Sequence, residues 1–264
     1  MSNYKTQLED YVKAIDQINR LHLNANNVYI IHYSCESFKD KALPKIIAIA
    51  LRNLETGQTH CFSISKCAAI MNIPKEKIED SYQQIEIQLL NDYFDFLQAR
   101  QTCTFLHWHM TNDKFGFQAI EYRFKHLGGK PILINDDNKI NLARLLTKIF
   151  GYENRDKLKI DILAELNYKP RSDYLDGKAE ALAFMYKNYD DITASTQLKT
   201  LIFATILHKL RTDDLITEIK IKWYQKRFAM KFIKRVLDNP IVSSIITLVS
   251  IAVTVLGIYY TILQ

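Results

Sequence analysis

Several common sequence features are scarce or missing in this chain of 264 residues, and each absence argues against a class of structure or functional site. Seven glycines and five prolines argue against long flexible linkers. The four cysteines lack the close paired spacing of a zinc site or a disulfide framework, and we interpret them as buried thiols of a cytosolic protein. No GxGxxG, GxxxxGK[ST], GxSxG or HExxH motif is present, so the familiar signatures of dinucleotide, phosphate, esterase and metalloprotease sites are absent.

Acidic residues are missing from a basic segment near the end of the chain. Residues 220–235 hold seven cations and no Asp or Glu. Positive charge beside a membrane span is retained in the cytosol, and such cations are attracted to anionic lipid. The segment therefore predicts contact with the inner face of a membrane through Lys220, Lys222, Lys226, Arg227, Lys231, Lys234 and Arg235.

Charge of either sign is missing from residues 241–263, an apolar run that follows Pro240. As a helix, this run is about 35 Å long at 1.5 Å per residue. A hydrocarbon core is about 30 Å thick. We expect a single transmembrane helix over 240–263 in the inner (cytoplasmic) membrane, with the N-terminal domain in the cytosol. The alternative is a buried helix of a soluble domain.

Small and polar residues within this run recur every three or four positions and form one seam along a helix. Helices in lipid associate through close backbone approach and interhelical hydrogen bonds. The seam predicts a homo-oligomer, and a polar path through the membrane is a further interpretation. The alternative is an accidental stripe, since these residue types are common in spans. The seam consists of Ser243, Thr247, Ser250, Thr254, Gly257 and Thr261.

Hydrophobic periodicity divides the rest of the chain into two parts. The first part predicts strands over 28–34, 46–51, 60–64, 102–108 and 132–134, and helices over 4–23, 66–71, 75–98, 115–126 and 141–150. The second part predicts only helices, over 160–167, 177–189 and 193–210, the last running almost without a break into the basic segment. We therefore expect an α/β domain over 1–150, a helical extension over 151–219, a basic juxtamembrane helix over 220–239 and the transmembrane helix over 240–263.

The order strand, two-strand hairpin, helix, strand, helix resembles the ribonuclease H-like fold, and in particular the DEDD-type 3′–5′ exonucleases. In that family the first strand ends with two carboxylates that hold two metal ions. Here Glu36 lies at that place, with Ser34 where its partner is expected. The resemblance implies catalytic roles for Glu36, for Asp113 after the fourth strand and for Glu180 on a late helix, with Mg²⁺ or Mn²⁺ as the cofactor. It implies an α/β ribonuclease H-like N-terminal domain, to which the helical C-terminal extension and the single C-terminal transmembrane helix are joined.

The segment LHWHMTNDKFGF is the most unusual sequence before the basic segment. It places two histidines on one face of a strand tip, followed by polar residues and a helix start, where α/β folds bind ligands. We predict a ligand or phosphate pocket formed by His107, His109, Asn112 and Arg123. The alternative is that the histidines cap the loop or bond a backbone carbonyl. A second interpretation is that His32 and Cys35 of the first strand neighbour His107 across the sheet and that a Cys–His nucleophile pair forms there.

An enzyme that acts on a soluble substrate gains little from a membrane anchor. The chain resembles the single-span membrane effectors of bacterial antiviral (abortive infection) defence, in which a soluble domain detects a nucleic acid, nucleotide signal or partner protein and the span damages the membrane. We predict a tail-anchored effector of this kind. Two alternatives are a membrane-tethered metal-dependent nuclease and a scaffold that recruits a partner protein to the membrane.

Overall fold

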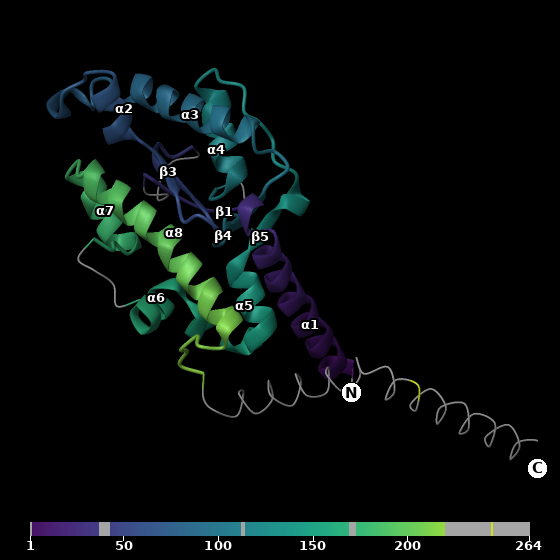
Figure 1. Cartoon of the computed structure of the whole chain (residues 1–264). Helices are drawn as coiled ribbons and strands as arrows, with labels where there is room; N and C mark the ends of the chain where they lie inside the picture. Colours follow the sequence, from purple (N-terminus) through teal and green to yellow (C-terminus); the bar gives the residue numbers. More distant parts are fainter. Residues whose placement is uncertain (1, 37–42, 112–113, 169–172, 220–243, 245–264) are drawn as a thin grey trace, which may run out of the picture. The chain divides into compact units, whose positions relative to one another are not determined.

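A mixed sheet of five strands lies at the centre of the described part of the chain (Figure 1). The computed structural model describes residues 2–36, 43–111, 114–168, 173–219 and 244. The strands are β1 (Val28–Cys35), β2 (Ile46–Asn53), β3 (Thr59–Ser63), β4 (Thr104–His107) and β5 (Lys139–Asn141), in the spatial order β3-β2-β1-β4-β5. β1, β2 and β3 pair antiparallel, whereas β4 and β5 run parallel to β1. The carboxyl ends of β1, β4 and β5 therefore lie at the same edge of the sheet.

Helices cover both faces of this sheet (Figure 1). The helices are α1 (Ser2–Leu23), α2 (Ile64–Ile70), α3 (Tyr82–Gln98), α4 (Phe117–His126), α5 (Leu142–Phe150), α6 (Ile160–Tyr168), α7 (Gly177–Met185) and α8 (Tyr189–Thr212). Short 3₁₀ segments are η1 (Ala25–Asn27), η2 (Lys75–Lys77), η3 (Asp136–Asn138) and η4 (Tyr152–Leu158). α2, α3 and α4 lie on one face, and α1, α5 and α8 lie on the other.

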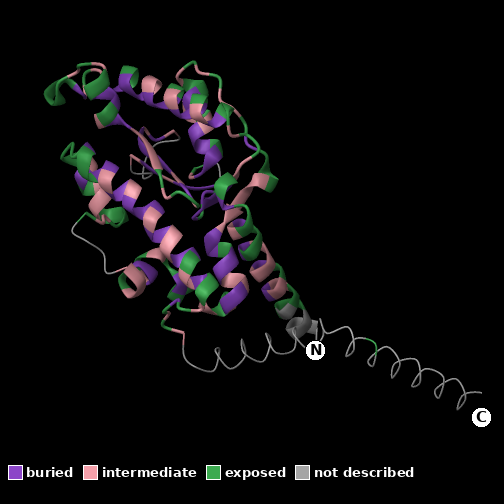
Figure 2. Ribbon diagram, viewed as in Figure 1, coloured by how far each residue is buried: buried purple, intermediate pink, exposed green. Residues whose placement is uncertain are grey.

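The alternation of side chains along β1 supplies both faces with apolar contacts. Tyr29, Ile31 and Tyr33 belong to the core that the sheet forms with α2, α3 and α4. On the opposite face, the ring of His32 packs edge-on against Phe203 of α8 at 5.6 Å between centroids. Buried residues accordingly lie on the sides of the helices that face the sheet (Figure 2). The sheet is thus covered on both sides.

α8 is an integral part of this fold. It packs directly against β1 and β2, and residues 1–217 form one compact unit. Ala48 and Ala50 alternate with the large residues of β2 and are completely buried, which allows a helix backbone to approach the sheet closely. The helices after residue 151 are therefore a layer of the same unit as the α/β part and do not stand apart as an extension.

The predicted fold class, an α/β ribonuclease H-like domain with a helical C-terminal extension and a single C-terminal transmembrane helix, needs correction. The fold observed is a five-stranded mixed sheet between two helical layers. No helix among the described residues is both long enough and apolar enough to cross a membrane. The basic segment and the apolar run that suggested a span lie outside the described residues, apart from Ser244.

Several element boundaries also differ from the sequence prediction, and three of them affect the interpretation. The fifth strand is Lys139–Asn141, whereas residues 132–134 are not a strand. α3 begins at Tyr82 rather than at residue 75, after a 3₁₀ turn. α8 ends at Thr212, because Asp213 adopts the left-handed conformation (φ 67°) that terminates helices, so it does not continue into the basic segment.

Candidate ligand-binding site

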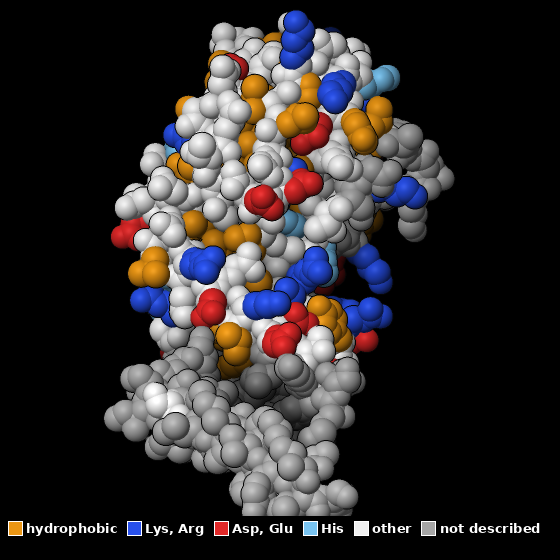
Figure 3. Space-filling view, turned by 90° about the vertical axis from the view of Figure 1, so that its right-hand side faces the viewer, with side chains coloured by type: hydrophobic (Ala, Val, Ile, Leu, Met, Phe, Trp, Pro, Cys, Tyr) orange, Lys and Arg blue, Asp and Glu red, His pale blue; other side chains and the backbone are white. Residues whose placement is uncertain are grey.

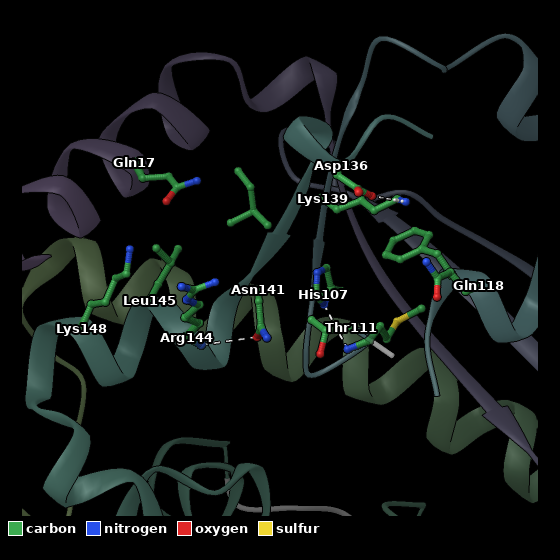
Figure 4. Close-up of a pocket in the computed structure, with 13 residues that line it drawn as sticks. Gln17, His107, Thr111, Gln118, Asp136, Lys139, Asn141, Arg144, Leu145 and Lys148 are labelled. Carbon is green, nitrogen blue, oxygen red and sulfur yellow. Dashed lines mark hydrogen bonds and ion pairs between the residues drawn. The ribbon is translucent and has the colours of Figure 1, made fainter. Parts of the chain in front are cut away.

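A pocket of about 550 Å³ lies where β4 and β5 end and α5 begins (Figure 4). Open α/β sheets bind ligands at the carboxyl ends of their parallel strands, and this pocket has that position. Its walls come from α1, β4, α4, β5 and α5, with the polar side chains of Gln17, His107, Thr111, Gln118, Asp136, Lys139, Asn141, Arg144 and Lys148. The volume is within the range of small-molecule sites.

Asn141 connects the N-terminus of α5 with the loop after β4 at the pocket. Its Oδ1 accepts hydrogen bonds from the backbone N–H of Arg144 (3.3 Å) and of His109 (3.4 Å). The first bond caps the N-terminus of α5, and the second holds the loop after β4 against β5. A single amide side chain thus fixes the position of the helix N-terminus relative to the end of β4.

His107 lines the pocket as a neutral hydrogen-bond donor. Burial of the ring, followed by the charges of His109 and Lys139, lowers its pKa to about 4. The Nδ1 of His107 accepts the backbone N–H of Met110 at 3.1 Å. Because a neutral imidazole has one donor and one acceptor nitrogen, the proton of His107 resides on Nε2. The structure therefore places this predicted residue in a pocket and gives it a fixed tautomer.

His109 contributes to the same loop through its backbone. It has a positive φ of 54°, an uncommon conformation for a residue other than glycine, and its side chain is exposed. Its carbonyl accepts the N–H of Thr111 at 2.9 Å, which tightens the turn. Its side chain is not part of the pocket wall among the described residues. Of the two histidine rings, His107 lines the pocket, and a role of the His109 ring in ligand binding stays a prediction.

Cations surround the pocket and are only partly neutralised. Lys139 Nζ lies 2.8 Å from Asp136 Oδ1, and Lys148 Nζ lies 4.0 Å from Asp10 Oδ1. Arg144 is exposed and, together with Lys148, projects from α5 toward the space below Gln17 (Figure 4). Arg144 and Lys148 are four positions apart and therefore share one side of α5. On the face in Figure 3, basic and acidic side chains are interspersed.

Arg123 and Asn112 are not observed in this pocket. Asn112 lies outside the described residues. Arg123 pairs with the fully buried Glu86, with Nη2–Oε2 at 2.6 Å and Nε–Oε1 at 2.9 Å. Glu86 Oε1 also accepts the backbone N–H of Ile46 at 2.7 Å, so the pair ties α3 and α4 to the start of β2. Arg123 thus holds elements of the fold together outside this pocket, and its role in binding a ligand stays a prediction.

Two of the three acids that the ribonuclease H-like resemblance implies lie near the end of β1. Glu180 Oε1 accepts a hydrogen bond from Ser34 Oγ at 3.0 Å and pairs with Lys199 Nζ at 2.7 Å. Glu180 and Glu36 both raise the pKa of the Cys35 thiol that lies between them. The third acid, Asp113, lies outside the described residues.

The acids near β1 do not fit a divalent metal ion. The ammonium group of Lys199 pairs with the carboxylate of Glu180 that would have to bind the metal ion. Ser34 stands where the second carboxylate is expected. Among the described residues, no three His, Cys, Asp or Glu side chains are grouped so that they could hold an ion. We therefore derive no metal-dependent step from this cluster.

His32 and Cys35 do not form an activated nucleophile. Burial raises the pKa of the Cys35 thiol, and the charges of Glu180 and Glu36 raise it further, so the thiol remains protonated. Burial lowers the pKa of His32 well below its usual value, with a smaller effect of Lys199 in the same direction. A neutral histidine and a protonated thiol are the expected states of core residues.

The sequence analysis overlooked the residues that give the pocket its charge. Lys139, Arg144 and Lys148 follow the loop after α4, and Gln17 comes from the first helix. A local signal for part of the site was present, because Asn141 precedes an amphipathic helix and is a favoured N-cap residue. The contribution of Gln17 depends on how α1 packs against α5, which no local pattern reveals.

Comparisons with protein-family models, with curated proteins and with solved structures find no match to this chain.

Proposed function

We propose that this chain is a ligand-binding protein whose sheet domain recognises a small phosphate-bearing ligand of the nucleotide class. The observation that carries the proposal is the pocket at the ends of β4 and β5, which combines three cations, a neutral imidazole donor and a capped helix N-terminus. Phosphate oxygens accept charge-assisted hydrogen bonds from Lys and Arg, and the positive end of a helix dipole favours an anion.

The surroundings of the pocket favour a small ligand over a long nucleic acid. Binding of an extended duplex requires many phosphate contacts along a basic surface. Here acidic side chains lie among the cations, and before Lys220 the acidic and basic residues nearly cancel. The local excess of positive charge is therefore suited to one or two phosphates.

We propose that the chain binds this ligand without hydrolysing it, because of the protonation and the pairing of the polar groups. The pocket contains a histidine that is neutral at physiological pH, and the carboxylate of Asp136 is bonded to Lys139. The candidate catalytic acid Glu180 is paired with Lys199. Among the described residues, neither site groups the carboxylates that metal-dependent phosphodiester hydrolysis requires.

Calorimetric titration of the full chain with inorganic phosphate and with the four nucleoside 5′-monophosphates tests the proposal. We expect binding by at least one nucleotide, and we expect the double variant Arg144→Ala/Lys148→Ala to raise Kd at least about tenfold, equivalent to 1.4 kcal/mol. The matched control is Arg155→Ala/Lys157→Ala, which removes the same charges from the exposed η4 segment.

Two results would contradict the proposal. One is the absence of binding by any of these probes at millimolar concentration. The other is an equal loss of affinity in the η4 control, which would show that the overall charge, and not the pocket, attracts the anion.

Membrane location and the effector role are the part of the proposal that depends on the sequence alone. Seven cations without an acid in residues 220–235 precede the uncharged run, and both segments lie outside the described residues apart from Ser244. We expect the full chain to sediment with vesicles that contain anionic lipid, and a chain ending at residue 219 to stay in solution. Equal sedimentation of the two chains would remove the membrane from the proposal and leave ligand binding intact.

A further inference from the structure

A second pocket of about 480 Å³ lies beside the first, between α1 and the amino ends of β1 and β4. Its wall includes Lys13, Gln17, Arg20, Val28, Thr104 and Ile140. The two pockets are similar in volume, and each is large enough for one small ligand group.

The two pockets adjoin across a shared wall. Gln17 of α1 and Ile140 of β5 line both. β5 is the last strand of the sheet order, and Ile140 is its middle residue, so the pockets follow one another along the outer edge of the sheet. In Figure 4, Gln17 lies on α1 opposite Leu145 and Arg144 of α5.

Each of the two pockets carries its own cations, and the wall that they share is uncharged. Lys13 and Arg20 are exposed and seven positions apart, about 10 Å along one side of α1. Gln17 lies between them, and Asp16 reduces but does not cancel their charge. At the other end lie Lys139, Arg144 and Lys148. The shared wall is uncharged and combines the amide of Gln17 with the aliphatic side chain of Ile140.

From this arrangement we infer that the groove takes a ligand with two phosphate groups separated by a nucleoside, namely a 5′-phosphorylated dinucleotide, in preference to a mononucleotide. The inference rests on the proposed function of the first pocket. Lys and Arg at each end bind one phosphate each, while Gln17 and Ile140 contact the ribose and base between them. A longer single strand requires a continuous basic track with several stacking aromatic side chains. The described wall of the groove has one phenylalanine, Phe117, and its cations are interrupted at Gln17 and Ile140.

Calorimetric titration of the full chain with the four nucleoside 5′-monophosphates and the four matching 5′-phosphorylated homodinucleotides tests this inference. We expect the best dinucleotide to bind at least about tenfold more tightly than its mononucleotide, a step of 1.4 kcal/mol. The variant Lys13→Ala/Arg20→Ala is expected to abolish this preference and leave mononucleotide affinity within about twofold. Since both side chains are exposed, an unchanged melting temperature serves as the check on folding.

The outcomes separate this inference from the proposed function. Equal affinity for mononucleotide and dinucleotide, or a dinucleotide preference that survives Lys13→Ala/Arg20→Ala, would overturn the inference. The proposed function would stand in both cases if mononucleotide binding still depended on Arg144 and Lys148. If the wild-type chain binds neither mononucleotides nor dinucleotides, both this inference and the proposed function are wrong.

Discussion

At the scale of single residues, the protonation state of His107 connects the site to the stability of the fold. Its pKa of about 4 in the folded protein lies below the ordinary value of 6.5, first because the ring is buried. The unfolded chain therefore binds a proton to this residue more readily than the native chain does between these two pH values. The neutral form, whose proton is on Nε2, is stable throughout the physiological range.

We predict that the free energy of unfolding decreases as the pH falls from about 6.5 to about 4, and that His107 contributes about 2–3 kcal/mol to this loss. The sign follows from the lowered pKa, since folding excludes the proton that the unfolded state accepts. Urea unfolding of the wild type and of His107→Gln across this range measures the contribution. Parallel pH profiles for the two proteins would contradict the assignment.

The ion pair between Arg123 and Glu86 is a second feature at this scale on which the stability of the fold depends. Glu86 is fully buried, and its carboxylate also accepts the N–H of Ile46, so loss of Arg123 leaves an uncompensated buried charge. We predict that Arg123→Met lowers the free energy of unfolding by about 3 kcal/mol. Chemical denaturation measures this, with the exposed Arg155→Met as a control expected to change it by less than about 0.5 kcal/mol. Equal effects of the two substitutions would mean that the pair has no special role.

At the scale of elements, the sequence predicts the long amphipathic and β-branched segments well and the short polar ones poorly. Apolar periodicity is strong in α1 and α5, and both begin and end within about two residues of the prediction. β5 has only three residues, Lys139–Asn141, and none of them is fully buried, so its pairing with β4 comes from tertiary context. Residues 132–134 carry the stronger local β signal, and Ile134 is instead buried in the core between α3 and α4 as part of a loop.

The start of α3 was mispredicted for a related reason. The segment after Pro74 has good helix formers, but Lys75 pairs with Asp190 at 2.5 Å and Glu79 accepts a hydrogen bond from Tyr189. Both partners lie at the start of α8, more than 100 positions later in the chain. Such contacts override local propensity and cannot be deduced from a short window.

Close packing of α8 on β2 gives a prediction for this element pair. Ala50 is completely buried on the face of β2 that α8 covers, so a larger side chain there forces the helix and the sheet apart. We predict that Ala50→Leu lowers the free energy of unfolding by about 1–3 kcal/mol. The exposed Ala99→Leu adds the same atoms outside the core and is expected to have an effect within about 0.5 kcal/mol. Urea unfolding that fails to distinguish the two variants would argue against the packing of α8 described here.

At the scale of the whole molecule, the main difference from the sequence prediction concerns domain organisation. The loss of strands after residue 151 suggested a separate helical extension, because hydrophobic periodicity shows that a helix has an apolar face without showing what that face contacts. In the structure, the apolar face of α8 covers β1 and β2. Residues 1–217 therefore constitute the folding unit.

A truncation series tests this unit. We predict that a chain of residues 1–217 unfolds cooperatively in urea, whereas residues 1–150 alone do not, because removal of α8 exposes one apolar face of the central strands. Circular dichroism and tryptophan fluorescence, which reports on Trp108 stacked against Phe203, follow the transition. A cooperative transition in the 1–150 chain would contradict the proposed organisation.

The central claim, that a phosphate-bearing ligand binds where β4 and β5 end, is tested most directly by amide chemical shifts of the 1–217 chain during titration with nucleoside 5′-monophosphates. We predict the largest changes at the N-terminus of α5, from Asn141 to Arg144, and in the turn from His109 to Thr111. Saturable changes confined to other parts of the molecule, or no changes at millimolar nucleotide, would contradict the account.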